Sequence, residues 1–81
     1  MKNMIITVEK DLTIHMVGVT EELAQYVGQR LDNYYDANGL SDYIISEESN
    51  GYKIDTFWND EEPTQEDLYN NVKRWLEDSH A

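Results

Sequence analysis

The stretch SDYIISEESNGYKIDTFWN, residues 41–59, predicts a β-hairpin and sets the fold of the surrounding chain. Asn50-Gly51 stands between two runs rich in β-branched and aromatic residues, and this dipeptide is the strongest short signal for a two-residue turn. A type I′ turn at these two residues would pair Ile45 with Thr56. Alternate residues of the hairpin then form one apolar face and one polar face.

The polar face of this hairpin combines acidic residues with two large apolar side chains. The same register places Ile44 opposite Phe57, with Asp42, Glu48 and Asp55 around them. We therefore expect an apolar pair at the centre of an acidic surface.

A second hairpin is predicted at the start of the chain, in MIITVEKDLTIHMV, residues 4–17. A three-residue loop over residues 9–11 would pair Val8 with Leu12 and Ile6 with Ile14. Both apolar sets then lie on one face, which fixes the register.

A helix is predicted in TEELAQYVGQRLDNYYDANG, residues 20–39. Thr20 is a favourable N-cap, and Asn38-Gly39 provides a left-handed stop. Gly28 costs about 1 kcal/mol relative to alanine in a helix, so it marks a close packing contact. The apolar stripe recurs at helical spacing and consists of Leu23, Val27, Leu31 and Tyr34.

A second helix is predicted from about Gln65 to Asp78, with Thr64 as its N-cap. Pro63 precedes the cap and blocks extension of the helix towards the N-terminus. Its apolar stripe consists of Leu68, Val72, Trp75 and Leu76.

The predicted order of elements is ββα followed by ββα, in a single domain over residues 1–81. This order favours an α+β, two-layer fold with a four-stranded antiparallel sheet and both helices packed on one face. The other face of the sheet would then meet solvent, and it is the acidic one.

The charge balance restricts the classes of partner. Seventeen Asp and Glu against six Lys and Arg give a formal net charge of −11, which repels nucleic acid and anionic membranes and attracts basic surfaces. Forty per cent hydrophobic residues favour a folded chain over a disordered one. The lack of cysteine and of a membrane-spanning run predicts a cytoplasmic protein without membrane contact.

Neither catalysis nor metal or cofactor binding is predicted. His15 is expected on the polar face of the second strand, beside Ile5, without partners that would make it a general base. The segment from Tyr34 to Ile45 has the glycine of a calcium loop, but its first and last positions lack the required acids. We therefore expect a binding protein and no enzyme, no catalytic residues, no metal and no cofactor.

The acidic sheet face and its rim form the candidate binding site. A solubilising surface is one interpretation; a protein-binding face with an apolar anchor in a charged rim is the other. A rigid array of carboxylates can also imitate the phosphates of DNA. The candidate residues on the face and beyond Trp58 are Asp42, Ile44, Glu48, Asp55, Phe57, Asp60, Glu61 and Glu62.

Two segments, SDYIISEESN (41–50) and QEDLYNNV (65–72), resemble small phage-encoded anti-CRISPR proteins that inhibit the type II RNA-guided nuclease. Those proteins act as DNA mimics in the basic site that reads the protospacer-adjacent motif. The resemblance implies that role for Asp42, Glu47, Glu48 and the acids near Asp60, and it implies a phage protein acting in the host cytoplasm.

The sequence thus leads to two hypotheses of function. The first is an acidic DNA mimic that binds the nucleic-acid site of a basic protein, without binding nucleic acid itself, as a monomer or weak homodimer. The alternative is a small cytosolic interaction or assembly domain without mimicry, with Ile44 and Phe57 in its interface.

Overall fold

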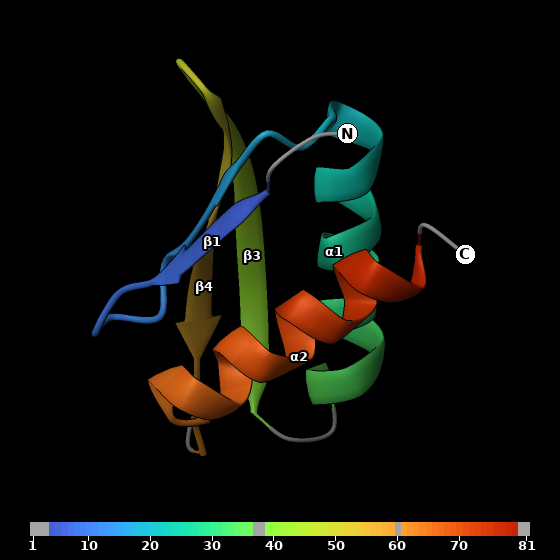
Figure 1. The fold of residues 1–81 in the computed structure, drawn as a ribbon. Helices are drawn as coiled ribbons and strands as arrows, with labels where there is room; N and C mark the ends of the chain where they lie inside the picture. The colour runs from blue at the N-terminus through green and yellow to red at the C-terminus, as the bar shows by residue number, and fades with distance from the viewer. Residues whose placement is uncertain (1–3, 37–38, 60, 80–81) are drawn as a thin grey trace.

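The four strands form one antiparallel sheet in the order β1-β2-β4-β3, as the computed structural model shows (Figure 1). The structure describes residues 4–36, 39–59 and 61–79. The elements are β1 (Ile5–Val8), β2 (Ile14–Val17), α1 (Glu21–Tyr35), β3 (Leu40–Glu48), β4 (Gly51–Trp58) and α2 (Gln65–Asp78). The predicted α+β fold with ββαββα order is confirmed.

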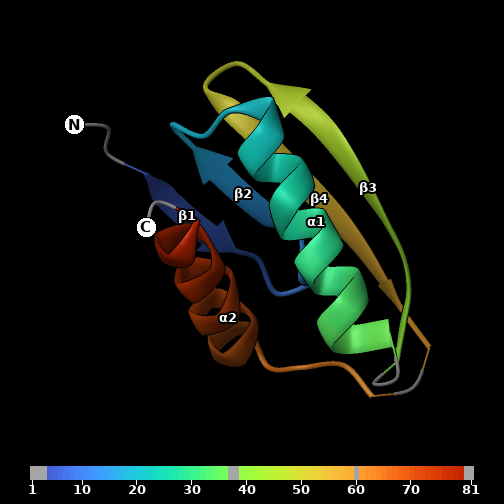
Figure 2. The ribbon, with the colours of Figure 1, turned by 90° about the vertical axis from the view of Figure 1, so that its right-hand side faces the viewer.

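Both helices lie on the same side of the sheet (Figure 2). Helix α1 packs against β3 and β4, and α2 packs against β1. The core between the layers includes Trp75, Leu31, Ile14 and Ile54, all fully buried. No helix of the described chain lies over the opposite face of the sheet.

Each helix begins at a threonine cap, as predicted. The Thr20 hydroxyl accepts a hydrogen bond from the Leu23 amide at 3.2 Å, and the Thr64 hydroxyl accepts one from the Asp67 amide at 3.0 Å. Each bond satisfies an amide that the first turn of a helix leaves without a backbone partner.

Gly28 and the two tyrosines of α1 show how the helix meets the sheet. A Cβ at Gly28 would lie 2.7 Å from Cε1 of Tyr43, which confirms the predicted close contact. The prediction that Tyr34 lies in the core is wrong: Tyr34 is half-exposed and Tyr35 is buried. Tyr35 follows Leu31 by four residues and so continues the stripe of Val27 and Leu31.

The first hairpin has a three-residue loop, but the loop lies one residue later than predicted. The Glu9 amide donates to the Thr13 carbonyl at 3.0 Å, which leaves residues 10–12 as the loop. Leu12 adopts φ 68°, the left-handed residue that such loops use to form a bulge. Ile6 therefore pairs with Met16, so the predicted partner has moved by two residues and the apolar face is kept.

The second hairpin also differs by two residues in its pairing, because its turn is Ser49-Asn50 and not Asn50-Gly51. Ile45 pairs with Ile54, and Glu48 pairs with Gly51. Neither Asn50 nor Gly51 has a positive φ, so the predicted type I′ turn is wrong. Gly51 instead allows a close approach, since a Cβ there would overlap the Met16 carbonyl oxygen of β2.

Candidate functional site

The face of the sheet that no helix covers, called the uncovered face here, combines acids with exposed apolar side chains. Four of the five large hydrophobic residues that the described chain exposes belong to it: Ile5, Val17, Ile44 and Phe57. They alternate along their strands with buried or half-buried residues that face the helices. Their shared face makes this surface the leading candidate for a binding site.

One corner of the uncovered face holds two acids and two apolar residues in alternation. Ile44 pairs with Asp55, and Asp42 pairs with Phe57, on the adjacent strands β3 and β4. Ile44 and Phe57 are therefore diagonal neighbours and not directly opposite as predicted. They are 50% and 45% exposed, respectively, so the predicted apolar pair is present and accessible. We call these four residues the β3–β4 corner.

A second apolar pair, not anticipated from the sequence, lies on the opposite edge strand and its neighbour. Ile5 of β1 pairs with Val17 of β2, and Val17 pairs with Gly51 at the far end of β4. The two apolar pairs therefore occupy opposite corners of the uncovered face, with polar residues between them. In the sequence, Ile5 and Val17 alternate with residues that face the helices, and this pattern could have predicted their exposure.

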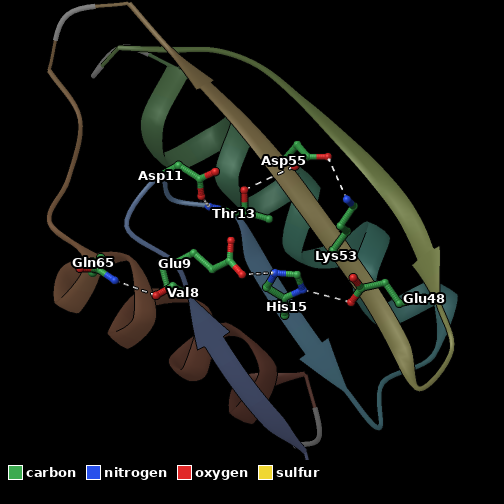
Figure 3. A network of polar contacts seen from close by, with 9 residues as sticks. All are labelled: Val8, Glu9, Asp11, Thr13, His15, Glu48, Lys53, Asp55 and Gln65. Carbon is green, nitrogen blue, oxygen red and sulfur yellow. Dashed lines mark hydrogen bonds and ion pairs between the residues drawn. The ribbon is translucent and has the colours of Figure 1, made fainter.

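His15 joins two acids in the middle of the uncovered face (Figure 3). Its Nε2 lies 3.0 Å from a carboxylate oxygen of Glu9, and its Nδ1 lies 3.1 Å from one of Glu48. The hydrogen bond to Glu48 raises the pKa of His15; partial burial opposes the shift, and the negative charges of Glu48 and Glu9 add to it. His15 pairs with Thr7, not with Ile5 as predicted.

Asp55, in the β3–β4 corner, is also in contact with neighbours. The Thr13 hydroxyl donates to it at 3.4 Å, and the ammonium of Lys53 lies 3.9 Å away (Figure 3). Asp42, in contrast, accepts only the amide of Tyr43, at 2.8 Å, and no cation of the described chain contacts it. Asp42 is therefore the carboxylate of this face most available to a partner.

Three of the predicted site residues lie away from the uncovered face. Glu47 has its side chain on the helix-facing side, beside Tyr52. Glu61 and Glu62 line a hollow of about 580 Å³ at the end of the helical layer. Its other lining residues are Tyr34, Tyr35, Pro63 and, from α2, Asp67, Asn70, Asn71 and Arg74. Asp60 lies outside the described residues.

The predicted acidic rim is consequently divided. The uncovered face carries Asp42, Ile44, Asp55 and Phe57 at one corner and Glu48 at the other end of β3, whereas the loop after β4 carries Glu61 and Glu62 to the end of the helical layer. Glu61 and Glu62, predicted beyond Trp58, therefore do not adjoin the acids of the uncovered face, because this loop runs from the sheet to α2.

Within residues 4–36, 39–59 and 61–79, no group of three His, Cys, Asp or Glu side chains is arranged to hold a metal ion. Neither helix in this part of the chain is long and apolar enough to cross a membrane.

Comparison of the chain with protein-family models, curated proteins and solved structures found no match. The case for a function therefore depends on the geometry of the uncovered face.

Proposed function

We propose that this protein binds a basic nucleic-acid-handling protein and occupies its nucleic-acid groove with the uncovered sheet face, as a mimic of DNA. The observation that carries the proposal is the β3–β4 corner, where Asp42 and Asp55 flank the exposed Ile44 and Phe57. An apolar anchor inside a charged rim is a common arrangement in protein interfaces.

The spacing of the two acids suits a surface that binds phosphate. Asp42 and Asp55 are diagonal neighbours on adjacent strands, a relationship that separates side chains by about 7–8 Å. This separation is close to the rise of two phosphates along one DNA strand, about 3.4 Å each. The sheet backbone holds the acids in fixed positions, which lowers the entropy lost on binding.

The net charge supports the same proposal. A formal charge of −11 draws the chain towards basic surfaces and keeps it from nucleic acid itself. The carboxylate of Asp42, which no cation of the described chain contacts, is the group that would meet an Arg or Lys of the partner.

The protein acts by binding and not by catalysis in this proposal. His15 has a carboxylate within hydrogen-bonding distance of each ring nitrogen, so neither nitrogen is free to take a proton from a substrate. The basic site of the type II RNA-guided nuclease is the first target to test, because the sequence resembles inhibitors of that enzyme.

A displacement assay tests the proposal directly. The guide-loaded nuclease is bound to a fluorescent duplex that carries the protospacer-adjacent motif, and the protein is added as competitor. Asp42→Asn with Asp55→Asn removes two charges from the β3–β4 corner. Asp32→Asn with Asp36→Asn removes two charges from exposed positions in the last turn of α1 and at its C-cap, and serves as the matched control.

We expect the corner variant to lose at least about tenfold in competition, because truncating one partner of a close charge pair costs about 2–5 kcal/mol. The control shares only the change in net charge and should lose about threefold or less. Both variants must retain the wild-type circular dichroism spectrum. No displacement of the duplex would contradict this target, and equal losses in the two variants would contradict the sheet-face site.

The alternative is an interaction or assembly domain without mimicry, and the position of the apolar residues favours it. Four exposed apolar side chains on one face would suit a largely hydrophobic interface. Salt separates the two functions, since exposed charges are screened within about 8–10 Å at physiological ionic strength. Mimicry predicts that affinity falls steeply with salt; an apolar interface predicts little change and a larger loss from Phe57→Ala.

A further inference from the structure

The outer edge of β3 carries backbone groups that no part of the described chain uses. Because the turn is Ser49-Asn50, Glu48 and Gly51 form the first hydrogen-bonded pair of the hairpin, and every second residue of β3 then bonds to β4. The residues between them, including Ile45 and Glu47, direct both N–H and C=O away from β4. No described residue bonds to these groups of Ile45 or Glu47.

The amide of Tyr43 confirms this orientation, because it also points outward and the Asp42 carboxylate accepts its hydrogen bond at 2.8 Å. The Asp42 side chain thus satisfies one outward-pointing amide of this edge. The next two residues whose backbone groups point outward, Ile45 and Glu47, have no such hydrogen bond within the described chain.

The opposite edge of the sheet is protected. Strand β1 has only four residues, and the side-chain amide of Gln65 donates to the Val8 carbonyl at 2.9 Å (Figure 3). Short edge strands and covered edges prevent strand addition. Strand β3, with nine residues, has neither protection beyond Tyr43.

A negatively charged hollow of about 220 Å³ lies directly inside the free edge. Its lining includes Glu21 at the start of α1, Glu47 and Ile45 on β3, and Tyr52 on β4, and it includes no Lys or Arg. Partial burial raises the pKa of Tyr52, and the negative charges of Glu47 and Glu21 raise it further. The hollow is therefore suited to a cationic side chain.

We propose that the β3 edge binds an extended basic peptide segment of a partner protein by antiparallel strand addition, with a Lys or Arg side chain in the hollow beside Glu47 and Glu21. A residue opposite Glu47 in the added strand has its Cβ about 4.5–5.5 Å from that of Glu47 and points to the same side of the sheet. A Lys or Arg at that position reaches both carboxylates.

The alternation of the added strand specifies the next positions. Two residues after the basic one, a side chain meets the half-buried Ile45, and the following side chain lies on the uncovered face beside Ile44. The preferred sequence of the segment is therefore a basic residue, then any residue, then two apolar residues. Strand addition of this kind takes affinity from main-chain hydrogen bonds and specificity from alternate side chains.

Charge selects a basic segment over a second copy of this chain. Antiparallel pairing of two β3 strands would bring together the acids at 42, 47 and 48 of both copies, within chains that each carry −11. Like charges on paired strands are destabilising. This site goes beyond the proposed mimicry, since it uses the edge and the helix-facing side of β3 and shares only Ile44 with the β3–β4 corner.

Fluorescent eight-residue peptides test the site on the full-length protein. One carries a Lys-Ser-Val-Val core, a second has Glu in place of Lys, and a third keeps the Lys but is N-methylated at the amide opposite Ile45. Glu47→Gln removes the carboxylate of the hollow, and Glu22→Gln removes a neighbouring exposed carboxylate on α1 with the same change in net charge. Binding is measured by fluorescence anisotropy and by amide shifts of Ile45 and Glu47 in NMR spectra.

We expect the Lys peptide to bind at least tenfold more tightly than the Glu peptide, and N-methylation to abolish binding. Glu47→Gln should weaken the Lys peptide about tenfold, and Glu22→Gln less than twofold. Equal weakening by the two Gln variants, unchanged binding of the N-methylated peptide, or a dimer of the chain that occupies the edge would overturn the proposal. Asp55→Asn changes the β3–β4 corner on β4 and leaves the β3 edge intact, so this variant should bind the peptide as wild type does, which separates this site from the proposed mimicry.

Discussion

Glu48 and His15 are hydrogen-bonded across an intervening strand. Glu48 ends β3, His15 lies on β2, and β4 runs between them, yet the Nδ1–Oε1 distance is 3.1 Å. The β4 residue paired with Glu48 is Gly51, which has no side chain to stand between the two groups. The contact ties an edge strand of the sheet to a central one.

The first prediction concerns the pH dependence that this contact gives to stability. The folded state raises the pKa of His15 above its ordinary value of 6.5, so the contribution is full below that value and is lost as the pH rises through the folded pKa. We expect the free energy of unfolding to fall by a few tenths to about 1 kcal/mol between about pH 6 and pH 8, the size of partly exposed ion pairs. Urea unfolding at several pH values measures it.

The control for this prediction compares two proteins that both carry His80→Gln, one of which also carries His15→Gln. His80→Gln removes the other histidine of the chain from the titration. If the two proteins lose stability in parallel over this pH range, the contact of His15 with Glu48 and Glu9 does not contribute.

The second prediction separates the roles of Asn50 and Gly51. Gly51→Ala should cost about 1–3 kcal/mol, the range for overpacking, because its Cβ would overlap the Met16 carbonyl oxygen. Asn50→Ala should cost less than about 0.5 kcal/mol, since Asn50 is exposed and has a negative φ. Chemical denaturation of both variants measures these losses of stability. A larger loss from Asn50→Ala than from Gly51→Ala would support a type I′ turn at Asn50-Gly51.

A third prediction uses the left-handed Leu12. Leu12→Ala should cost about 2–5 kcal/mol, because the side chain is buried. Glycine is ordinarily less stable than alanine by about 0.5–1 kcal/mol, but at φ 68° it avoids a strain of about 1–2 kcal/mol. Leu12→Gly should therefore be at least as stable as Leu12→Ala in urea unfolding. A Leu12→Gly variant that is less stable than Leu12→Ala would mean that the backbone of Leu12 is not strained.

The fourth prediction concerns the buried hydroxyl of Tyr35. The Asn71 side chain donates to it at 2.6 Å, and Asn71 is itself buried. Tyr35→Phe leaves that amide hydrogen without a partner, so it should cost about 1–3 kcal/mol in the free energy of unfolding. Tyr26→Phe, at a half-buried ring whose hydroxyl makes no hydrogen bond within the described chain, is the control and should change stability by about 0.5 kcal/mol or less.

The order of elements and the face of each strand could be predicted from the sequence, because period-2 and period-3.6 patterns report burial directly. The exact strand partners could not. Pairing is set at the turns, where a left-handed Leu12 and the tight approach of Gly51 to Met16 depend on contacts from elsewhere in the chain. Each error moved the partner by two residues, and an even shift keeps every side chain on its face.

The candidate site was predicted in part for the same reason. Residues on one hairpin, Ile44 and Phe57, share a face by alternation alone, so the sequence places them together. The contact of His15 with Glu48 joins residues 33 positions apart on strands that are not neighbours, and no local pattern reports it. The path of the loop after β4, which removes Glu61 and Glu62 from that face, is likewise a property of the assembled layers.

The unequal edges of the sheet limit how folded molecules can join one another. Within the described residues, Gln65 and the short β1 restrict strand addition on one side of the sheet, which leaves the longer β3 as the open edge. Growth of a continuous intermolecular sheet requires two open edges per molecule. Strand addition at the β3 edge therefore adds one strand to each folded molecule and does not propagate, and extended fibre growth requires prior unfolding of β1 or α2.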